Sequence, residues 1–154
     1  MKAYAGDDDQ VAVPNGVRYI APYLSAYEGI ASLSLPEGLL SVGEGAFQGG
    51  KMRSLAFPAT LLLIDRYAFA DCDDLERVIL PGRLLFLREG AFSDCPKLKK
   101  IEIPGDLREI ERGAFRACHP DLTICAPAGG EAQRYAGEYG FRFEAIGQAA
   151  SGTR

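Results

Sequence analysis

The sequence is organised by the stretch Leu75-Glu-Arg-Val-Ile-Leu-Pro81-Gly-Arg-Leu-Leu-Phe-Leu-Arg-Glu-Gly-Ala-Phe92-Ser-Asp-Cys95-Pro-Lys-Leu98. Its proline belongs to a ladder in which prolines recur every 22 or 23 residues, at Pro14, Pro36, Pro58, Pro81, Pro104 and Pro127. An Ala-Phe pair recurs with the same step, at Ala46-Phe47, Ala68-Phe69, Ala91-Phe92 and Ala114-Phe115. Two independent features with one period indicate internal repeats, and repeats decide the whole fold.

Each repeat predicts one short strand that ends at its proline. The residues before the proline alternate between apolar and variable positions, as in Leu33-Ser34-Leu35, Leu55-Ala56-Phe57, Val78-Ile79-Leu80 and Ile101-Glu102-Ile103. A period of two is typical of a strand, and proline ends it because it lacks an amide hydrogen for the next ladder bond. A single unit of this size cannot bury its own Leu and Phe side chains, so successive units are expected to stack.

The repeat unit closely resembles that of BspA-type leucine-rich repeat proteins. The proline, the Ala-Phe pair, the Cys three residues after the Phe and the following Leu all fall where that family has them, over about Val11 to Pro127. Ala126 to Ala136 resembles the closing segment of such arrays. The resemblance implies a leucine-rich repeat solenoid of the α/β horseshoe class: a strand-rich, right-handed stack of about five 22- to 23-residue coils with a C-terminal helix-strand cap.

We expect one domain over residues 1–154, with tails at 1–10 and 147–154, repeats at 11–127 and a C-terminal cap at 128–146. In the cap, Ala132, Tyr135, Ala136 and Tyr139 have the spacing of an amphipathic helix that Gly140 ends, and residues 141–146 alternate as a last strand. At the other end, Pro22 and Gly29 bracket a predicted short helical cap over residues 23–28.

Composition narrows the function classes. The chain has 154 residues, 47% of them hydrophobic, and a formal net charge of −4, so the basic surface typical of nucleic-acid binders is missing. No apolar run approaches the roughly 20 residues that a membrane span needs. The first residues carry no apolar signal-peptide segment, which favours the cytoplasm, whereas the family resemblance suggests the cell surface.

No cofactor or metal site is expected. Met52 stands where a phosphate-binding loop needs Ser or Thr, and Cys72, Cys95 and Cys118 follow the repeat rather than forming close zinc-binding pairs. These three cysteines are predicted to be buried free thiols, while Cys125 is predicted to be exposed and reactive. The acidic run Asp71, Asp73, Asp74 and Glu76 is read as a solvated loop rather than a weak cation site.

A surface ion ladder is also predicted. Glu44, Arg66, Glu89 and Arg112 occupy one register position in successive coils and alternate in sign. Stacking would therefore give each charge opposite neighbours, although exposed pairs contribute only about 0.2 to 1 kcal/mol each.

Two surfaces are candidates for binding a partner. The strand face carries the variable residues of the repeated strand: Ser32, Ser34, Ser54, Ala56, Arg77, Ile79, Lys100, Glu102, Thr123 and Cys125. The apolar stripe consists of residues four and five positions after the prolines: Leu40, Leu62, Leu63, Leu85 and Phe86. If the stripe faces outward, it forms a contiguous apolar patch of the kind that marks contacts with other molecules, and otherwise it is folded inward.

These features predict a non-enzymatic protein-protein interaction module, adhesin-like in the form that the family resemblance suggests. The alternative is a structural or self-associating spacer segment of a bacterial surface or cytoplasmic assembly. The partner is expected to be a protein, with self-association as one form of binding, and neither nucleic acid nor a cofactor is expected to bind.

Overall fold

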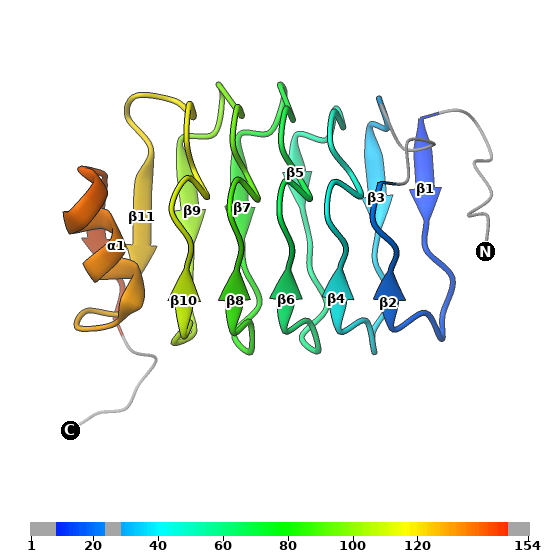
Figure 1. Cartoon of the computed structure of the whole chain (residues 1–154), viewed down its shortest axis with the longest axis horizontal. Coiled ribbons are helices and arrows are strands. Elements are labelled where there is room, and N and C mark those ends of the chain that lie inside the picture. The colour runs from blue at the N-terminus through cyan, green and yellow to red at the C-terminus, as the bar shows by residue number, and fades with distance from the viewer. Residues whose placement is uncertain (1–8, 24–28, 148–154) are drawn as a thin grey trace.

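The computed structural model describes residues 9–23 and 29–147. A short strand precedes each ladder proline, and a two-residue strand follows each of them except Pro127 (Figure 1). The strands before the prolines are β1 (Gln10–Ala12), β3 (Ser32–Ser34), β5 (Ser54–Leu55), β7 (Arg77–Ile79), β9 (Lys100–Glu102) and β11 (Thr123–Ala126). The strands after them are β2 (Tyr19–Ile20), β4 (Ser41–Val42), β6 (Leu63–Ile64), β8 (Phe86–Leu87) and β10 (Glu109–Ile110).

The strands form two parallel sheets on opposite walls of the solenoid. The first sheet runs β5-β7-β9-β11-β12, with β1 and β3 as a separate pair, and the second sheet runs β2-β4-β6-β8-β10. Every pairing is parallel, and equivalent residues of successive coils lie side by side (Figure 1). The predicted solenoid is therefore confirmed. The second sheet was not predicted, and its strands occupy the wall where the α/β horseshoe class would place helices.

A column of phenylalanine rings fills the centre. Phe47, Phe69, Phe92 and Phe115 are at most 1% exposed, and neighbouring ring centroids are 5.5, 5.4 and 6.0 Å apart with nearly parallel planes. Offset stacking at this distance is favourable beyond the burial of apolar area. Tyr135 of the helix closes the column with an edge contact to Phe115 at 6.0 Å. The predicted stacking register is thus confirmed.

The repeated cysteines form a second buried column. The thiols of Cys72, Cys95 and Cys118 lie 3.7, 3.3 and 3.1 Å from the backbone carbonyl oxygens of the preceding coil's Phe residues. All three are free thiols, as predicted, and only Cys118 is partly exposed. Contact with the Cys95 thiol is the main cause that raises the pKa of Cys118 above its usual range, and burial is the second cause. These cysteines therefore act as small apolar residues with weak hydrogen bonds.

The long turns repeat a left-handed residue at equivalent positions. Gly45, Tyr67, Gly90 and Gly113 have φ values of 63, 55, 65 and 80°. At Gly90 a β-carbon would lie 2.3 Å from the ring of Tyr67, so this position needs glycine both for its backbone and for the tyrosine packed on it.

The C-terminal end closes with α1 (Glu131–Tyr139) and β12 (Arg142–Ala145), as the periodicity predicted. Ala132, Tyr135 and Ala136 are buried, and Gly140 ends the helix in the left-handed conformation with a φ of 76°. Tyr139 remains 40% exposed although it falls on the same helical stripe. The predicted N-terminal helical cap lies outside the described residues except for Tyr23, and no helix of the described part has the length and apolarity of a membrane span.

Candidate interaction surfaces

The strand face lies on the outer side of the first sheet and of the β1-β3 pair. One outward row contains Ser54, Arg77, Lys100 and Thr123, and a second contains Ile79 and Glu102. Ser32, Ser34, Ser54, Ala56, Arg77 and Ile79 are exposed, whereas Lys100, Glu102 and Thr123 are half-buried. The predicted orientation of these side chains is therefore correct, with exposure decreasing toward the C-terminus.

Charges on the strand face partly neutralise one another. Glu102 lies 2.6 Å from the Arg77 guanidinium and 3.6 Å from the Lys100 ammonium group. Beside this cluster, Ile79 is 45% exposed. An isoleucine next to a small ion-paired group is a mixed surface, with apolar area for contact and charges that orient a partner.

The prediction for Cys125 is wrong. This residue was expected to be exposed on the strand face, but its side chain is fully buried. The cause is β12, which pairs with β11 and places Cys125 between Glu102 and Glu144 in the sheet register. These longer side chains flank the short thiol, which lies 3.8 Å from a carboxylate oxygen of Glu144. Burial raises the pKa of the Cys125 thiol, so it lacks the features of a reactive cysteine.

The apolar stripe lies on the second sheet. Leu40, Leu62 and Leu85 form one column across successive coils, and Leu63 and Phe86 belong to the adjacent column. All five are half-buried. They are neither folded into the core, where Leu61 and Ile64 lie, nor fully exposed. The structure therefore brings the predicted stripe residues together on one surface.

The backbone explains why two consecutive residues share this surface. In each coil the amide hydrogens of both residues are donated to one carbonyl of the preceding coil, as when Leu62 and Leu63 both donate to Leu40 at 2.9 and 3.3 Å. The same pattern recurs for Leu85 and Phe86 on the carbonyl of Leu62. Two amides on one carbonyl depart from the regular parallel ladder, and at these residues the alternation of side chains between the two faces of the sheet is interrupted.

Polar and aromatic residues border the stripe. Arg18 and Arg108 are the exposed ends of the column that contains Leu40, Leu62 and Leu85. Tyr19 and Glu109 are the exposed ends of the column that contains Ser41, Leu63 and Phe86, and Tyr19 is 67% exposed. The apolar patch is therefore bounded by basic groups on one column and by an aromatic and an acidic group on the other.

The predicted ion ladder is wrong by one residue. No ion pair joins Glu44, Arg66, Glu89 and Arg112 within the described chain. The pair forms instead one position earlier, where Arg88 lies 2.8 Å from Glu111 and 5.0 Å from the ring centre of Phe86. These side chains are partly buried, whereas Arg66, Glu89 and Arg112 are exposed in the turns. Burial acts to raise the pKa of Glu111. The hydrogen bond from Arg88 acts in the opposite direction, and the pKa lies below its usual range.

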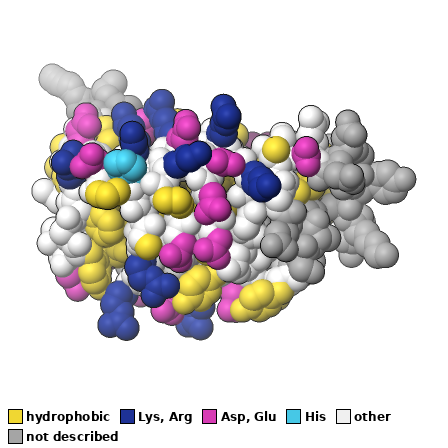
Figure 2. All heavy atoms as spheres, turned by 90° about the horizontal axis from the view of Figure 1, so that it is seen from above, with side chains coloured by type: hydrophobic (Ala, Val, Ile, Leu, Met, Phe, Trp, Pro, Cys, Tyr) yellow, Lys and Arg dark blue, Asp and Glu magenta, His cyan; other side chains and the backbone are white. Residues whose placement is uncertain are grey.

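The edge formed by the long turns carries charges of both signs. Figure 2 looks onto this edge and shows acidic and basic side chains interspersed over it. Lys97 lies 3.0 Å from Asp74, and the Gln48 amide donates to Asp71 at 2.8 Å. Two members of the acidic run are thus engaged within the surface. In residues 9–23 and 29–147, no group of three or more potential ligands has the geometry to hold a metal ion.

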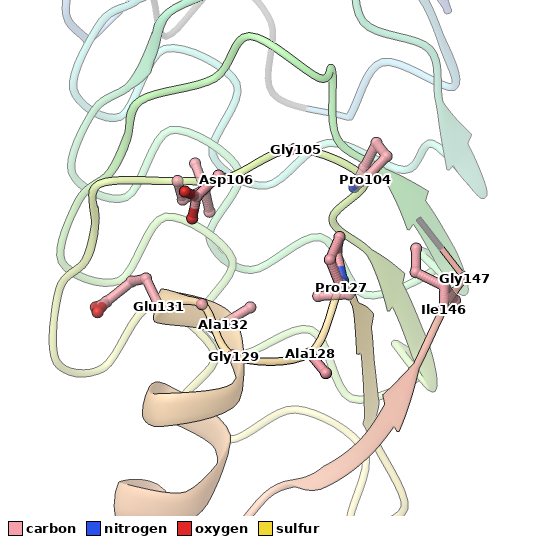
Figure 3. Close-up of a pocket in the computed structure, with 13 residues that line it drawn as sticks. Pro104, Gly105, Asp106, Pro127, Ala128, Gly129, Glu131, Ala132, Ile146 and Gly147 are labelled. Carbon is pink, nitrogen blue, oxygen red and sulfur yellow. The ribbon is translucent and has the colours of Figure 1, made fainter. Parts of the chain in front are cut away.

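The best-formed pocket, of about 540 Å³, lies where the repeats meet the cap. Figure 3 shows it between the turn at Gly105 and Asp106 and the turn at Ala128 and Gly129 that leads into α1. Its lining is mostly Gly, Ala and Pro, and its ionisable residues are Asp106 and Glu131. Glu131 is occupied by Arg134 at 2.6 Å and by the Ile110 amide at 3.2 Å. This hollow is therefore a junction between structural elements, and Glu131 serves there to hold the helix start to the last coil.

Solved structures with the same fold include three bacterial proteins. A leucine-rich repeat protein from Bacteroides ovatus matches with a TM-score of 0.55 and 24% identity over 78% of this chain and 40% of that one. A leucine-rich cell surface protein from Faecalibacterium prausnitzii gives 0.50 and 21%, over 75% of this chain and 40% of that one. The pneumococcal vaccine antigen PcpA gives 0.65 and 16%, over 92% of this chain and 42% of that one.

This chain therefore spans about two fifths of the length of these structural neighbours. A comparison with curated proteins gives no match. The family model of the BspA-type leucine-rich repeat region matches residues 6–122 in six copies, in line with the expected stack of about five coils. The chain belongs to the BspA-type leucine-rich repeat family.

Proposed function

We propose that this chain is a non-enzymatic module that recognises another protein, chiefly through the strand face. The observation that carries the proposal is the pair of outward rows, in which exposed side chains are held in fixed register on parallel strands. Such rows change side chains from coil to coil without disturbing the buried Phe and Leu columns. A rigid frame with exchangeable outer residues reduces the entropy that binding costs.

The chemistry of the face indicates the kind of partner. Its N-terminal part presents small hydroxyl and methyl groups at Ser34, Ser54 and Ala56, and its middle presents Ile79 beside the Arg77–Glu102 pair. A protein surface with a central apolar residue and a polar rim would complement it. One structural neighbour is a cell surface protein, and a surface setting with adhesin-like recognition is the form of this role that we propose for this chain.

Capture with matched variants tests the proposal. The experiment immobilises the wild-type chain and the variants Ile79→Glu and Ala59→Glu. Each is incubated with extracts and surface fractions of the source organism and of its environment, and the bound proteins are then cross-linked to it. Ala59 is exposed in a turn away from the strand face, so its variant gains the same charge elsewhere. We expect a protein captured by the wild type and by Ala59→Glu to be lost on Ile79→Glu. Identical capture by all three would contradict the strand face, and substrate turnover by the pure protein would contradict a non-enzymatic role.

A further inference from the structure

We propose that the apolar stripe is the contact of a two-fold dimer, in which a second copy of this chain packs its second sheet onto the first. This inference rests on the proposed interaction role and names the partner of one of its surfaces. The second sheet has five strands, and Figure 1 shows its strands side by side along the stack. Their outer surface carries the apolar stripe with Arg18, Tyr19, Arg108 and Glu109 at its ends.

Two consecutive half-buried residues in each coil make the stripe a double column, and the two columns complement each other. A two-fold axis that runs along the stack between the columns keeps the coil order and reverses the strand direction. It therefore places each residue of the first column opposite the next residue of the same coil in the second copy. Leu62 then faces Leu63, and Leu85 faces Phe86, of the second copy. Each contact occurs twice, as two-fold symmetry requires.

The ends of the columns fit the same arrangement. Arg108 lies opposite Glu109 of the second copy, and Arg18 lies opposite the exposed ring of Tyr19, so one end forms ion pairs and the other cation-π contacts. Arg18 and Arg108 make no ion pair with any described residue of their own chain. Both guanidinium groups therefore have capacity for a partner.

The alternative two-fold axis runs across the stack and reverses the order of the coils. It superposes each column on itself, which places Arg108 opposite Arg18 of the second copy. Like charges face each other in that arrangement, and such contacts are unfavourable. The charge pattern therefore selects the dimer in which both solenoids run in the same direction.

The size of the surface sets the expected strength. Five strands spaced at about 4.8 Å span roughly 20 Å along the stack, and the two columns add only a narrow width. Such an area lies at the small end of specific interfaces, below about 1,200 Å² in total. We therefore expect a reversible dimer that forms in the micromolar range or above rather than an obligate one.

Sedimentation velocity of the full chain from about 5 to 500 µM tests the proposal over the concentrations where a small interface associates. The wild type is expected to shift from monomer to dimer, and Leu62→Glu to abolish the shift. Arg108→Glu and Glu109→Arg change exposed positions, so they keep the test valid if Leu62→Glu misfolds. Each is expected to weaken association by about tenfold or more, because it creates a like-charge contact twice per dimer. Asp73→Arg, at an exposed position of a long turn, is the control that leaves association unchanged.

The charge swap is the decisive variant. Arg108→Glu combined with Glu109→Arg restores opposite charges across the interface, so association is expected to return to within about threefold of the wild type. A monomer at every concentration, or a double variant no better than the single ones, would overturn the proposal. Stronger association of Arg108→Glu would also overturn it, because the new carboxylate would then be facing Arg18 in the reversed dimer. Strand-face capture that persists in any of these cases would leave the proposed function standing.

Discussion

Replacing Phe92 by Ala tests the energetic centre of the fold. The ring is fully buried and stacks on Phe69 at 5.4 Å and on Phe115 at 6.0 Å. Truncation removes the apolar burial of the ring, opens a cavity between two coils and ends both ring contacts. Buried Phe-to-Ala changes cost about 3 to 5 kcal/mol, which includes the roughly 0.5 to 1.5 kcal/mol of each aromatic pair.

The expected cost translates into a thermal shift. For a chain of this size each kcal/mol lowers Tm by about 2 to 4 °C, so Phe92→Ala is expected to melt roughly 6 to 20 °C below the wild type. Phe92→Leu retains much of the side-chain volume and is expected to lose only about 1 to 2 kcal/mol. Tyr19→Ala, at a position that is 67% exposed, is expected to change stability by less than about 0.5 kcal/mol.

The stability of all three variants is measured by thermal and urea denaturation, with circular dichroism as the signal of unfolding. The order of stability should be Tyr19→Ala, then Phe92→Leu, then Phe92→Ala. Two outcomes would refute a central stacked phenylalanine column. One is a Tm of Phe92→Ala within about 2 °C of the wild type, and the other is that Phe92→Ala is not the least stable of the three variants.

Three further predictions concern the thiols, the backbone and the acid response. A thiol-specific reagent should label Cys125 in native protein much more slowly than in urea, because burial raises the pKa of its thiol, and rapid native labelling would contradict its burial. Gly105→Ala should lower the free energy of unfolding by about 1 to 3 kcal/mol in urea titrations, since its β-carbon would lie 2.0 Å from the Gly82 carbonyl oxygen, whereas Gly82→Ala meets no atom within 4 Å and should be nearly neutral. Hydrogen bonding to Arg134 holds the pKa of Glu131 below its ordinary 4.5, so this stabilisation is complete above pH 4.5 and is lost as the pH falls through the lower folded-state pKa. Glu131→Gln should accordingly reduce stability at pH 7 and flatten the urea-midpoint profile below pH 4.5, and an unchanged profile would contradict the pairing.

The coil period and the buried columns were predictable because stacking repeats the same constraint in every coil. Phe92 can be buried only if equivalent rings lie above and below it, so the recurrence of Ala-Phe already contains the packing. The helix of the cap followed from the spacing of Ala132, Tyr135 and Ala136 for the same reason: one buried face fixes one period.

The second sheet was missed because its strands have two residues and interrupt the alternation that identifies a strand. In Leu61-Leu62-Leu63-Ile64 the outer two positions are buried and the inner two are half-buried, a pattern that fits neither a period of two nor one of 3.6. The signal was nevertheless present, because buried residues three apart around two less buried ones recur in coil after coil. That pattern accompanies the repeated pair of amides that share one carbonyl.

The errors at Cys125 and in the ion ladder have different causes: a non-repeated strand in the first case, and in the second the partial burial of the preceding register position. Cys125 is covered because β12, which belongs to the cap, adds a strand beside β11. Arg88 pairs with Glu111 because partial burial at the end of the second sheet brings these side chains together, whereas Arg66 and Glu89 lie in the exposed turns. A register alignment predicts which residues are stacked, but it cannot predict which of them a non-repeated element covers.

The division between inner and outer columns also indicates where specificity resides in this chain. An inner substitution is felt by the coils on both sides, so the inner columns are restricted to Phe, Leu, Ile and small residues of matching size. An outer residue contacts its neighbours only along the surface, and the outer rows accordingly pass from Ser54 through Arg77 to Lys100 without altering the backbone register. The apolar stripe departs from this rule, because Leu62, Leu63 and Phe86 are large apolar residues at positions where stacking does not require them. Since these residues are only half-buried within the coil, contact with a second molecule would remove further apolar area from water, and the two-fold pairing that we propose would do so with this chain's own residues.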